Sequence, residues 1–452
     1  MKFRVGFTVL LAVLCLGACG QSSESPGSTD GESTSAAGQS ADSGEESKGT
    51  LNVLFMSGVY ADSARSMTEE FKEKTGYDVE VSDVPFASFH ETAMLDFASQ
   101  AGSYDVVAVN LSWLGEFAPH LEPLDARVEE SGMDVEGFIP AVYDACKWDG
   151  VLYGFPKAPT PNMMAYRTDL IETPPTTYEE YMEMAAQFNN PDEGMYGISI
   201  PGKKEQYAVL YLVRSWAMGA DVADEDWNVI VNGEIGRQAM EQLGEVTKYS
   251  DPAGLSWGLE ESINAFIQGK AAFCEAWPTL GIIQSADDPE QSQICGNWAI
   301  APFPEEKTGL KQMSIWCVAV SNYSKQKDIA FEWIKDYSSL ENQERFYDEF
   351  GILPSYTSFW EKDEIKNSIV GPLGEGLKKC LPKWRIPVSA ELDSIMANAV
   401  SSYMSGQMDL DETMEFFDSE LTRALENNPP PEGSKNDTAI AIENALQEAQ
   451  QE

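Results

Sequence analysis

Histidine and basic side chains are scarce in this 452-residue chain. It has two histidines, and 30 lysines and arginines against 74 aspartates and glutamates. The formal charge of −44 excludes a protein that grips nucleic acid through its phosphates. The chain also lacks a Cys-x-x-Cys pair, which together with the two histidines excludes a metal site of the usual histidine and cysteine type. We expect no metal and no cofactor.

Motifs of common enzymes are missing as well. There is no Gly-x-Ser-x-Gly elbow, no phosphate-binding loop and no histidine placed to activate a nucleophile. We therefore expect a binding protein and not an enzyme. A lipid-anchored, glycan-active enzyme stays open as an alternative, because a glycosidase needs only two suitably spaced acids. A lipid-anchored adhesin or signalling receptor is a third reading.

The apolar run near the N-terminus, 5–18, is too short to span a bilayer comfortably and has the pattern of an export signal. Lys2 and Arg4 precede it, and Leu16-Gly17-Ala18-Cys19 resembles a bacterial lipobox. We expect residues 1–18 to be a cleaved signal peptide and Cys19 to carry a lipid that holds the protein on the extracytoplasmic face of the cell membrane. An ordinary secretory signal is the alternative.

The segment that follows lacks aromatic residues. Residues 20–49 are almost all Ser, Gly, Glu, Asp, Thr and Ala, so residues 19–49 are predicted to form a disordered tether. Beyond it the cysteines are odd in number and widely spaced. We expect mostly buried free thiols, with one pair possible, among Cys146, Cys274, Cys295, Cys317 and Cys380.

The rest of the chain is long enough and, at 43% hydrophobic residues, apolar enough for two domains. The pattern of its first part predicts a βαβαβ unit. The strands are expected at 51–55, 79–84 and 105–109. One helix contains Ala64, Met67 and Phe71, and the other contains Ala93, Met94 and Phe97. Ligands of such sheets bind beyond the carboxyl ends of the strands. This selects the turns at 56–60, 85–89 and 110–113.

A proline-rich segment, 153–162, has no helical or strand period and is predicted to cross to a second lobe. Thr177 and Glu180 predict a capping box there. Further strands are predicted at 195–200, 228–231, 271–273 and 298–301, and helices at 206–216 and 234–249. Gly269 is placed to end a helix in the left-handed conformation.

The chain then returns to a strand at 314–320 and a helix containing Ile329, Trp333, Ile334 and Tyr337. Crossings between the lobes are expected near Pro159, Pro304 and Gly351. Helices are predicted at 390–404 and 410–425, followed by a polar tail, 429–452, that holds at most one marginal helix.

Short motifs along nearly the whole chain after the tether resemble the family 1 extracellular solute-binding proteins of ABC importers, which include maltodextrin-binding proteins. They are Tyr104-Asp-Val-Val107, Tyr153-Gly-Phe-Pro156, Tyr166-Arg-Thr-Asp-Leu170, Gly269-Lys-Ala-Ala272, Ala301-Pro-Phe-Pro304 and Gly351-Ile-Leu-Pro354. The resemblance implies an α/β, two-lobed periplasmic-binding-protein fold with three crossover segments and a ligand cleft between the lobes. The lobes would comprise 50–158 with 308–350, and 159–307 with 351–428. One departure is Ala276-Trp277-Pro278, where maltodextrin-type members often have Gly-Pro-Trp.

A sugar needs flat aromatic surfaces and positioned polar groups, and both occur at loop positions of this chain. Ser57, Tyr60, Asn110 and Trp113 follow strands of the first lobe. In the second lobe, Glu275 is a candidate to accept hydroxyl protons and Trp277 to stack on the ligand. The other candidates, each weighed against a core role, are Trp216, Trp316, Trp384 and Arg385.

The function predicted from these features is capture of an extracellular carbohydrate, most simply an oligosaccharide. The lobes close on the ligand, and the closed protein then docks on the permease subunits of an ABC importer. We expect a monomer that contacts the membrane through its N-terminal lipid and has no nucleic-acid partner.

Overall fold

The computed structural model describes residues 47–275, 277 and 281–450. The predicted signal peptide, Cys19 and nearly all of the predicted tether lie outside these residues. Within the described part, no helix combines the length and the apolar character that a membrane span requires. The described chain contains two main sheets, a two-stranded β-hairpin and two large clusters of buried apolar side chains.

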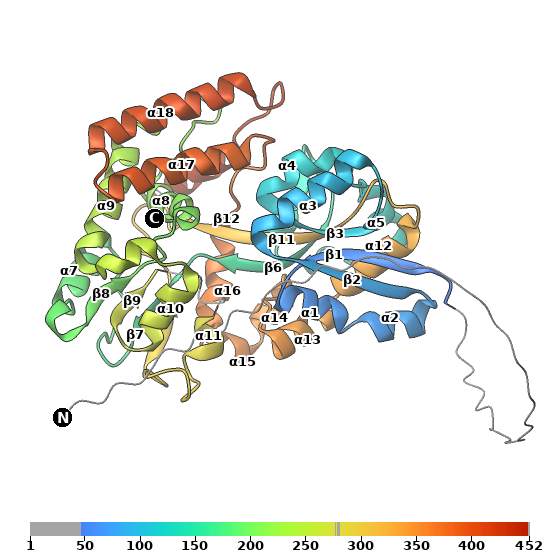
Figure 1. The fold of residues 1–452 in the computed structure, drawn as a ribbon, viewed down its shortest axis with the longest axis horizontal. Helices are drawn as coiled ribbons and strands as arrows, with labels where there is room; N and C mark the ends of the chain where they lie inside the picture. The colour runs from blue at the N-terminus through green and yellow to red at the C-terminus, as the bar shows by residue number, and fades with distance from the viewer. Residues whose placement is uncertain (1–46, 276, 278–280, 451–452) are drawn as a thin grey trace, which may run out of the picture. The chain divides into compact units, whose positions relative to one another are not determined.

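The first sheet has the strand order β12-β11-β3-β1-β2, with β6 paired to β11. β1, β2 and β3 are parallel, which confirms the predicted βαβαβ unit, and β11 runs antiparallel to β3. Figure 1 shows helices α1 and α2 on one face of this sheet and α3 and α4 on the other. The strands are β1 Thr50–Met56, β2 Asp78–Val84, β3 Val106–Asn110, β6 Phe155–Pro161, β11 Lys311–Val320 and β12 Cys380–Leu381, and β4 Lys147–Trp148 and β5 Val151–Leu152 form the hairpin.

The helix predicted to contain Ala64, Met67 and Phe71 is two helices, because the chain turns at Ser66 and Met67. Ser66 and Thr68 donate their hydroxyls to backbone carbonyls three residues back, which competes with regular helix formation. The three apolar side chains are nevertheless all buried. The helices before the second sheet are α1 Val59–Arg65, α2 Thr68–Thr75, α3 Phe86–Ser99, α4 Leu114–Phe117, α5 Asp125–Ser131 and α6 Pro140–Asp144.

The proline-rich crossing predicted to be irregular contains a strand instead. β6 pairs antiparallel with β11, and all of its residues are buried. Proline cannot donate to a ladder, so in sheets it is confined to positions such as edge strands. β6 meets that condition because β11 is its only strand partner in the described chain.

The second sheet has the order β10-β7-β9-β8. Its strands are β7 Met164–Arg167, β8 Tyr196–Ser199, β9 Ala271–Cys274 and β10 Trp298–Ala301. The prediction missed β7, and the predicted strand at 228–231 is only an isolated bridge between Ala223 and Val229. The capping box of Thr177 and Glu180 is confirmed, and Gly269 has the expected positive φ of 73°.

Helices cover this sheet and extend away from it. In Figure 1, α17 and α18 lie side by side beyond α8 and α9. The helices of this part are α7 Tyr178–Gln187, α8 Lys204–Met218, α9 Glu234–Val246, α10 Leu259–Ile267, α11 Ile282–Ser285, α17 Ser389–Met404, α18 Leu410–Asn427 and α19 Asp437–Ala449. α19 falls in the predicted polar tail, and its Ile442 is buried in the second apolar cluster.

The third crossing lies further along the chain than Gly351, where we predicted it. Beyond Gly351 the chain adds a series of helices and then β12, which still pairs with β11 of the first sheet. Leu381 of β12 packs against the second apolar cluster, and Trp384 is the first residue beyond Gly351 that lies in it. The helices of the return segment are α12 Lys327–Tyr337, α13 Leu340–Phe350, α14 Thr357–Glu361, α15 Asp363–Lys366 and α16 Gly371–Lys378.

Candidate functional site

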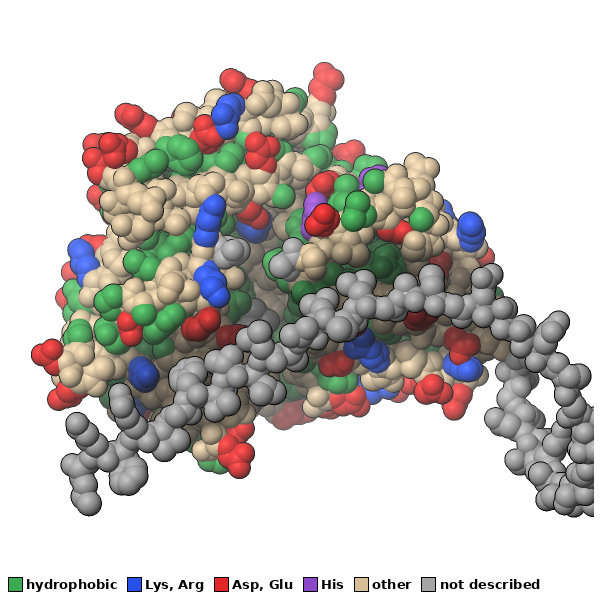
Figure 2. All heavy atoms as spheres, in the orientation of Figure 1, with side chains coloured by type: hydrophobic (Ala, Val, Ile, Leu, Met, Phe, Trp, Pro, Cys, Tyr) green, Lys and Arg blue, Asp and Glu red, His purple; other side chains and the backbone are tan. Residues whose placement is uncertain are grey.

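A cavity of about 670 Å³ is lined by residues from both sheets and their helices. Met56 ends β1, Phe86 follows β2, and Asn110 ends β3, so the carboxyl ends of three parallel strands open onto it, as predicted. From the second lobe come residues of α8, α10 and α17, together with Trp277. A hollow between the lobes is visible on the face drawn in Figure 2.

Aromatic rings of the first lobe form one wall of this cavity, which we call the aromatic wall. Phe86 stacks on Trp113 with ring centroids 5.8 Å apart, and Trp113 meets Trp316 edge to face at 5.6 Å. Tyr60 lies against Trp316 at 6.3 Å. Phe86 remains 54% exposed, whereas Tyr60 and Trp316 are buried. The wall therefore combines rigid, packed rings with one ring that is free to meet a ligand.

Three residues of the cavity lining carry a buried polar atom that has no hydrogen-bond partner in the described structure. They are the indole N–H of Trp277, Oε1 of Gln312 and Oδ1 of Asp393. Gln312 donates its amide to the carbonyl of Met313, and Asp393 uses its other oxygen for Lys383. An unsatisfied buried group costs about 1–3 kcal/mol. One donor and two acceptors of the lining residues are thus left unbonded within the described structure.

Behind the aromatic wall lies a lysine that the sequence analysis did not single out. Lys157 is 2% exposed, and its ammonium has no hydrogen-bond partner among the described residues. Its Nζ lies 4.0 Å from the ring centroid of Tyr60 and 5.0 Å from that of Phe55. Burial lowers the pKa of Lys157 to about 7, although Cys317 acts in the opposite direction. Burial also raises the pKa of Tyr60 to about 12.

Five of the residues proposed from sequence line the cavity: Tyr60, Asn110, Trp113, Trp277 and Trp316. Asn110 caps the turn that carries Trp113, because its Oδ1 accepts from the backbone N–H and the hydroxyl of Ser112. This bond orients the ring that follows. Contact of these five residues with a ligand stays a prediction.

Glu275 is not in the cavity lining, which corrects the expectation that its carboxylate faces a ligand. The side chain is fully buried, and its two oxygens accept from Arg214 at 2.6 and 2.8 Å. The hydroxyl of Tyr181 donates to the same carboxylate at 2.8 Å. Burial acts to lower the pKa of Arg214, but Glu275 beside it leaves that pKa raised. Glu275 directly follows β9, and these bonds hold its side chain against α7 and α8.

Trp216 and Trp384, candidates that were weighed against a core role, take part in a buried structural network and do not line the main cavity. Both indole N–H groups donate to the buried carboxylate of Asp221, at 3.0 and 2.7 Å. The amide of Asn436, just before α19, donates to the same carboxylate at 2.9 Å. We call these four residues the Asp221 network. It ties α8, the third crossing and the C-terminal segment together.

Arg385 and Ser57 also lie outside the main cavity. Arg385 donates to the backbone carbonyls of Asp144, Ala145 and Lys147 at 2.8 to 3.2 Å, so its guanidinium is occupied. Burial lowers the pKa of Arg385. It lines a separate cavity of about 540 Å³ together with Trp384. Ser57 follows β1, and its backbone N–H donates to the carbonyl of Val84.

The sequence analysis missed several polar and aromatic residues of the lining. Phe86 lies in a turn that was selected, at 85–89, but the ring itself was not named. Strand alternation gave no signal for Gln312, because the register of β11 shifts between Ser314 and Trp316 and residues 312–316 all line the cavity. The lining residues that were missed and matter most are Phe86, Thr160, Lys204, Gln312, Lys383 and Asp393.

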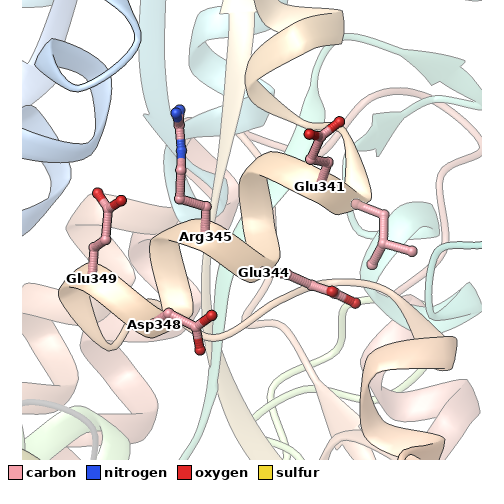
Figure 3. A pocket seen from close by; sticks show the side chains of 6 residues that line it. Glu341, Glu344, Arg345, Asp348 and Glu349 are labelled. Carbon is pink, nitrogen blue, oxygen red and sulfur yellow. The ribbon is translucent and has the colours of Figure 1, made fainter.

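A different hollow, on α13, has no features of a binding site. All its lining residues come from this one helix, and Figure 3 shows Glu341, Arg345 and Glu349 on one side of it and Glu344 and Asp348 on another. Four are acidic, and Arg345 among them pairs with Glu70 at 3.3 Å. Nowhere in the described part of the chain do three or more His, Cys, Asp or Glu side chains gather as a metal would require.

Comparison with known proteins agrees with this architecture. The chain is 28% identical to a mannitol-binding protein of Pseudomonas aeruginosa over 250 residues, which is 52% of this chain but only 56% of that relative. It is 23% identical to a maltodextrin-binding protein of Bacillus subtilis over 89% of this chain and 94% of the relative.

The fold matches that of an ABC transporter solute-binding protein of Agrobacterium radiobacter solved with ribitol. The TM-score is 0.73 at 22% identity, and the match covers 84% of this chain and 99% of the other. This confirms the two-lobed periplasmic-binding-protein fold. Residues 57–344, more than half of the chain, match the model of one family. The protein therefore belongs to the bacterial extracellular solute-binding proteins.

Proposed function

We propose that this protein is the substrate-binding component of an ABC importer and that its cleft captures a sugar or sugar alcohol. One observation carries the proposal: the aromatic wall faces a cavity whose lining also includes Trp277, Gln312 and Asp393, each of which has an unbonded buried polar atom. A polyhydroxy compound has apolar C–H faces for the rings and hydroxyls that both donate and accept hydrogen bonds.

Closure of the lobes supplies the coupling between binding and transport. The aromatic wall belongs to the first lobe, whereas Lys204, Leu259 and Trp277 belong to the second. A ligand that touches both sets favours the closed state, because only there are all contacts made. The closed protein would then be the form that a permease recognises.

The relatives support this ligand class without defining its size. One is named for mannitol and one for maltodextrin, and a structural neighbour holds ribitol. The sequence analysis favoured an oligosaccharide, and the cavity of about 670 Å³ leaves room for ligands larger than a single polyol. We propose a range from sugar alcohols to short oligosaccharides.

The binding test is a panel of mannitol, ribitol, glucose, maltose and maltotriose. At least one should raise the melting temperature, because a ligand that binds only the folded state stabilises it by mass action. The same compound should change tryptophan fluorescence. Silence across the panel and across sugar acids would reject the ligand class.

The site itself is tested by Phe86→Ala. Because Phe86 is 54% exposed, its removal should leave stability nearly unchanged, while the loss of a stacking ring weakens binding by about fivefold. Leu95→Ala is the matched control, since Leu95 lies on the same helix, is 65% exposed and does not line the cavity. Equal affinities for both variants would remove Phe86 from the site.

We further propose that Cys19 carries a lipid anchor and that the protein acts as a monomer beside its permease. Leu16-Gly17-Ala18-Cys19 supports the anchor. Cys19→Ser in the producing cell should release the protein into the medium. Retention of the variant in the membrane fraction would contradict lipidation at this residue.

A further inference from the structure

The charged residues of the main cavity are few and mostly basic, in a chain that is strongly acidic. Only Lys204, Lys383 and Asp393 are charged among its lining residues. The whole chain has 74 acidic against 30 basic side chains. A cavity wall drawn at random from this chain would be acidic, so the lysines are the feature that needs an explanation.

Lys383 in the third crossing and Asp393 in α17 neutralise each other. The ammonium of Lys383 donates to Asp393, and both side chains are largely buried. Lys204 differs, because no carboxylate of the described side chains lies within ion-pairing distance of it. Its neighbour Lys203 does have such a partner, Glu261 at 3.8 Å, and does not line the cavity. Lys204 is therefore the uncompensated charge of the cavity lining.

Two further features add positive potential and a hydrogen-bond donor to the same cavity lining. It is the first residue of α8, a 15-residue helix whose N-cap residue makes no side-chain cap hydrogen bond, so the positive end of the helix dipole is uncapped. Trp277 lines the same cavity, is 5% exposed, and has an indole N–H without a partner. Figure 2 shows basic side chains along the edge of the lobe that borders the hollow.

We propose that the ligand of this cleft is a polyhydroxy carboxylate, such as an aldonic or uronic acid, and that its carboxylate binds between the Lys204 ammonium and the Trp277 indole N–H. The inference rests on the proposed function, since it assigns the ligand class within the same cleft. The hydroxyl end then lies on the aromatic wall and donates to Gln312 and Asp393. The negative charge of the whole protein opposes the ligand only weakly, because salt screens it beyond about 8 Å at physiological ionic strength.

Calorimetry with matched pairs tests the proposal: mannitol against mannonate, and glucose against glucuronate. A charge-assisted hydrogen bond is roughly twice as strong as a neutral one, so the acid of at least one pair should bind about tenfold more tightly than its neutral partner. The advantage should shrink as sodium chloride rises. Lys204→Gln should abolish the advantage, because the acid then loses its charged partner. Lys203→Gln, the adjacent control, should preserve the advantage.

Each remaining outcome counts against a defined part of the proposal. If neutral compounds bind as tightly as their acids, the carboxylate is wrong while the proposed function stands. If acids are preferred but Lys204→Gln has no effect, the position of the carboxylate is wrong. A stronger preference for mannitol 1-phosphate than for mannonate would replace the carboxylate by a phosphate. If no compound binds the wild-type protein, the proposed function fails as well.

Discussion

The main cavity and the interior around the second apolar cluster, here called the second core, both contain tryptophan and acidic side chains. The two regions differ in whether the polar atoms of these side chains are hydrogen-bonded. In the second core, Trp216 and Trp384 donate to Asp221, and the oxygens of Glu275 are bonded by Arg214 and Tyr181. In the cavity, the N–H of Trp277 and one oxygen of Asp393 have no partner in the described structure.

The difference distinguishes these two sets of residues, although unbonded buried atoms also occur away from the cavity, at Nε of Arg214 and at the indole N–H of Trp333. A buried polar group is normally bonded, so an unbonded one on a cavity wall is an unusual and costly feature. Residue type alone does not reveal it, because the same residues serve both purposes. Substitutions in both regions test this difference.

Arg214→Met should have the largest effect, because it leaves the fully buried carboxylate of Glu275 without its cation. Removing one partner of a buried ion pair typically costs about 3–5 kcal/mol, which we expect as a loss in the free energy of unfolding measured with urea. The variant with both Arg214→Met and Glu275→Gln should recover part of the loss. Ligand affinity of the folded protein should change little. A stable variant that fails to bind would return Glu275 to the ligand site.

Lys157→Met tests the unpartnered ammonium behind the aromatic wall. Its folded-state pKa of about 7 lies below the unfolded value of about 10.4. The unfolded state therefore holds more protons between these values, and the penalty from Lys157 is full below pH 7 and fades as the pH rises to 10. The substitution should raise the free energy of unfolding by about 2–3 kcal/mol near pH 7 and by much less at pH 10.

The control for this experiment is Lys203→Met, in which the lost ammonium is exposed. It should leave the pH dependence of unfolding unchanged. The interpretation of Lys157 would be wrong if its substitution changed stability equally at pH 6 and pH 10.

Trp277→Phe and Trp216→Phe compare the two regions most directly, and their effects are the smallest. Each keeps an aromatic ring and removes one N–H. Loss of the bond to Asp221 should make Trp216→Phe less stable by about 1 kcal/mol without changing affinity. Trp277→Phe should keep its stability and bind about fivefold more weakly, because the lost donor serves only the ligand. Calorimetry gives the affinity and urea unfolding gives the stability of both variants. A destabilised Trp277→Phe with unchanged affinity, or a stable Trp216→Phe that binds weakly, would contradict the roles assigned to the two residues.

Local features of the fold were well predicted. The βαβαβ unit, the capping box at Thr177 and the positive φ of Gly269 follow from periodicity and from single-residue preferences, which act over a few neighbouring residues. The failures were of two kinds. The prolines of β6 hid a strand whose stability depends on its position at a sheet edge, and Gly351 marked a turn but not the crossing. Both failures arise because the structure of each segment depends on pairing with β11, which lies far from it in the sequence.

The sequence by itself determined the two-lobed family, the order of most elements and the turns that carry the cavity residues. Only the tertiary structure decided which of the candidate side chains face the cavity. Glu275 finds Arg214 across 61 residues, and Trp384 finds Asp221 across 163, so no local pattern reveals that these groups are satisfied. The same long-range packing leaves the indole N–H of Trp277 and the ammonium of Lys204 without such partners among the described residues. Hydrogen bonding between distant segments therefore determines which residues are structural and which are available to bind.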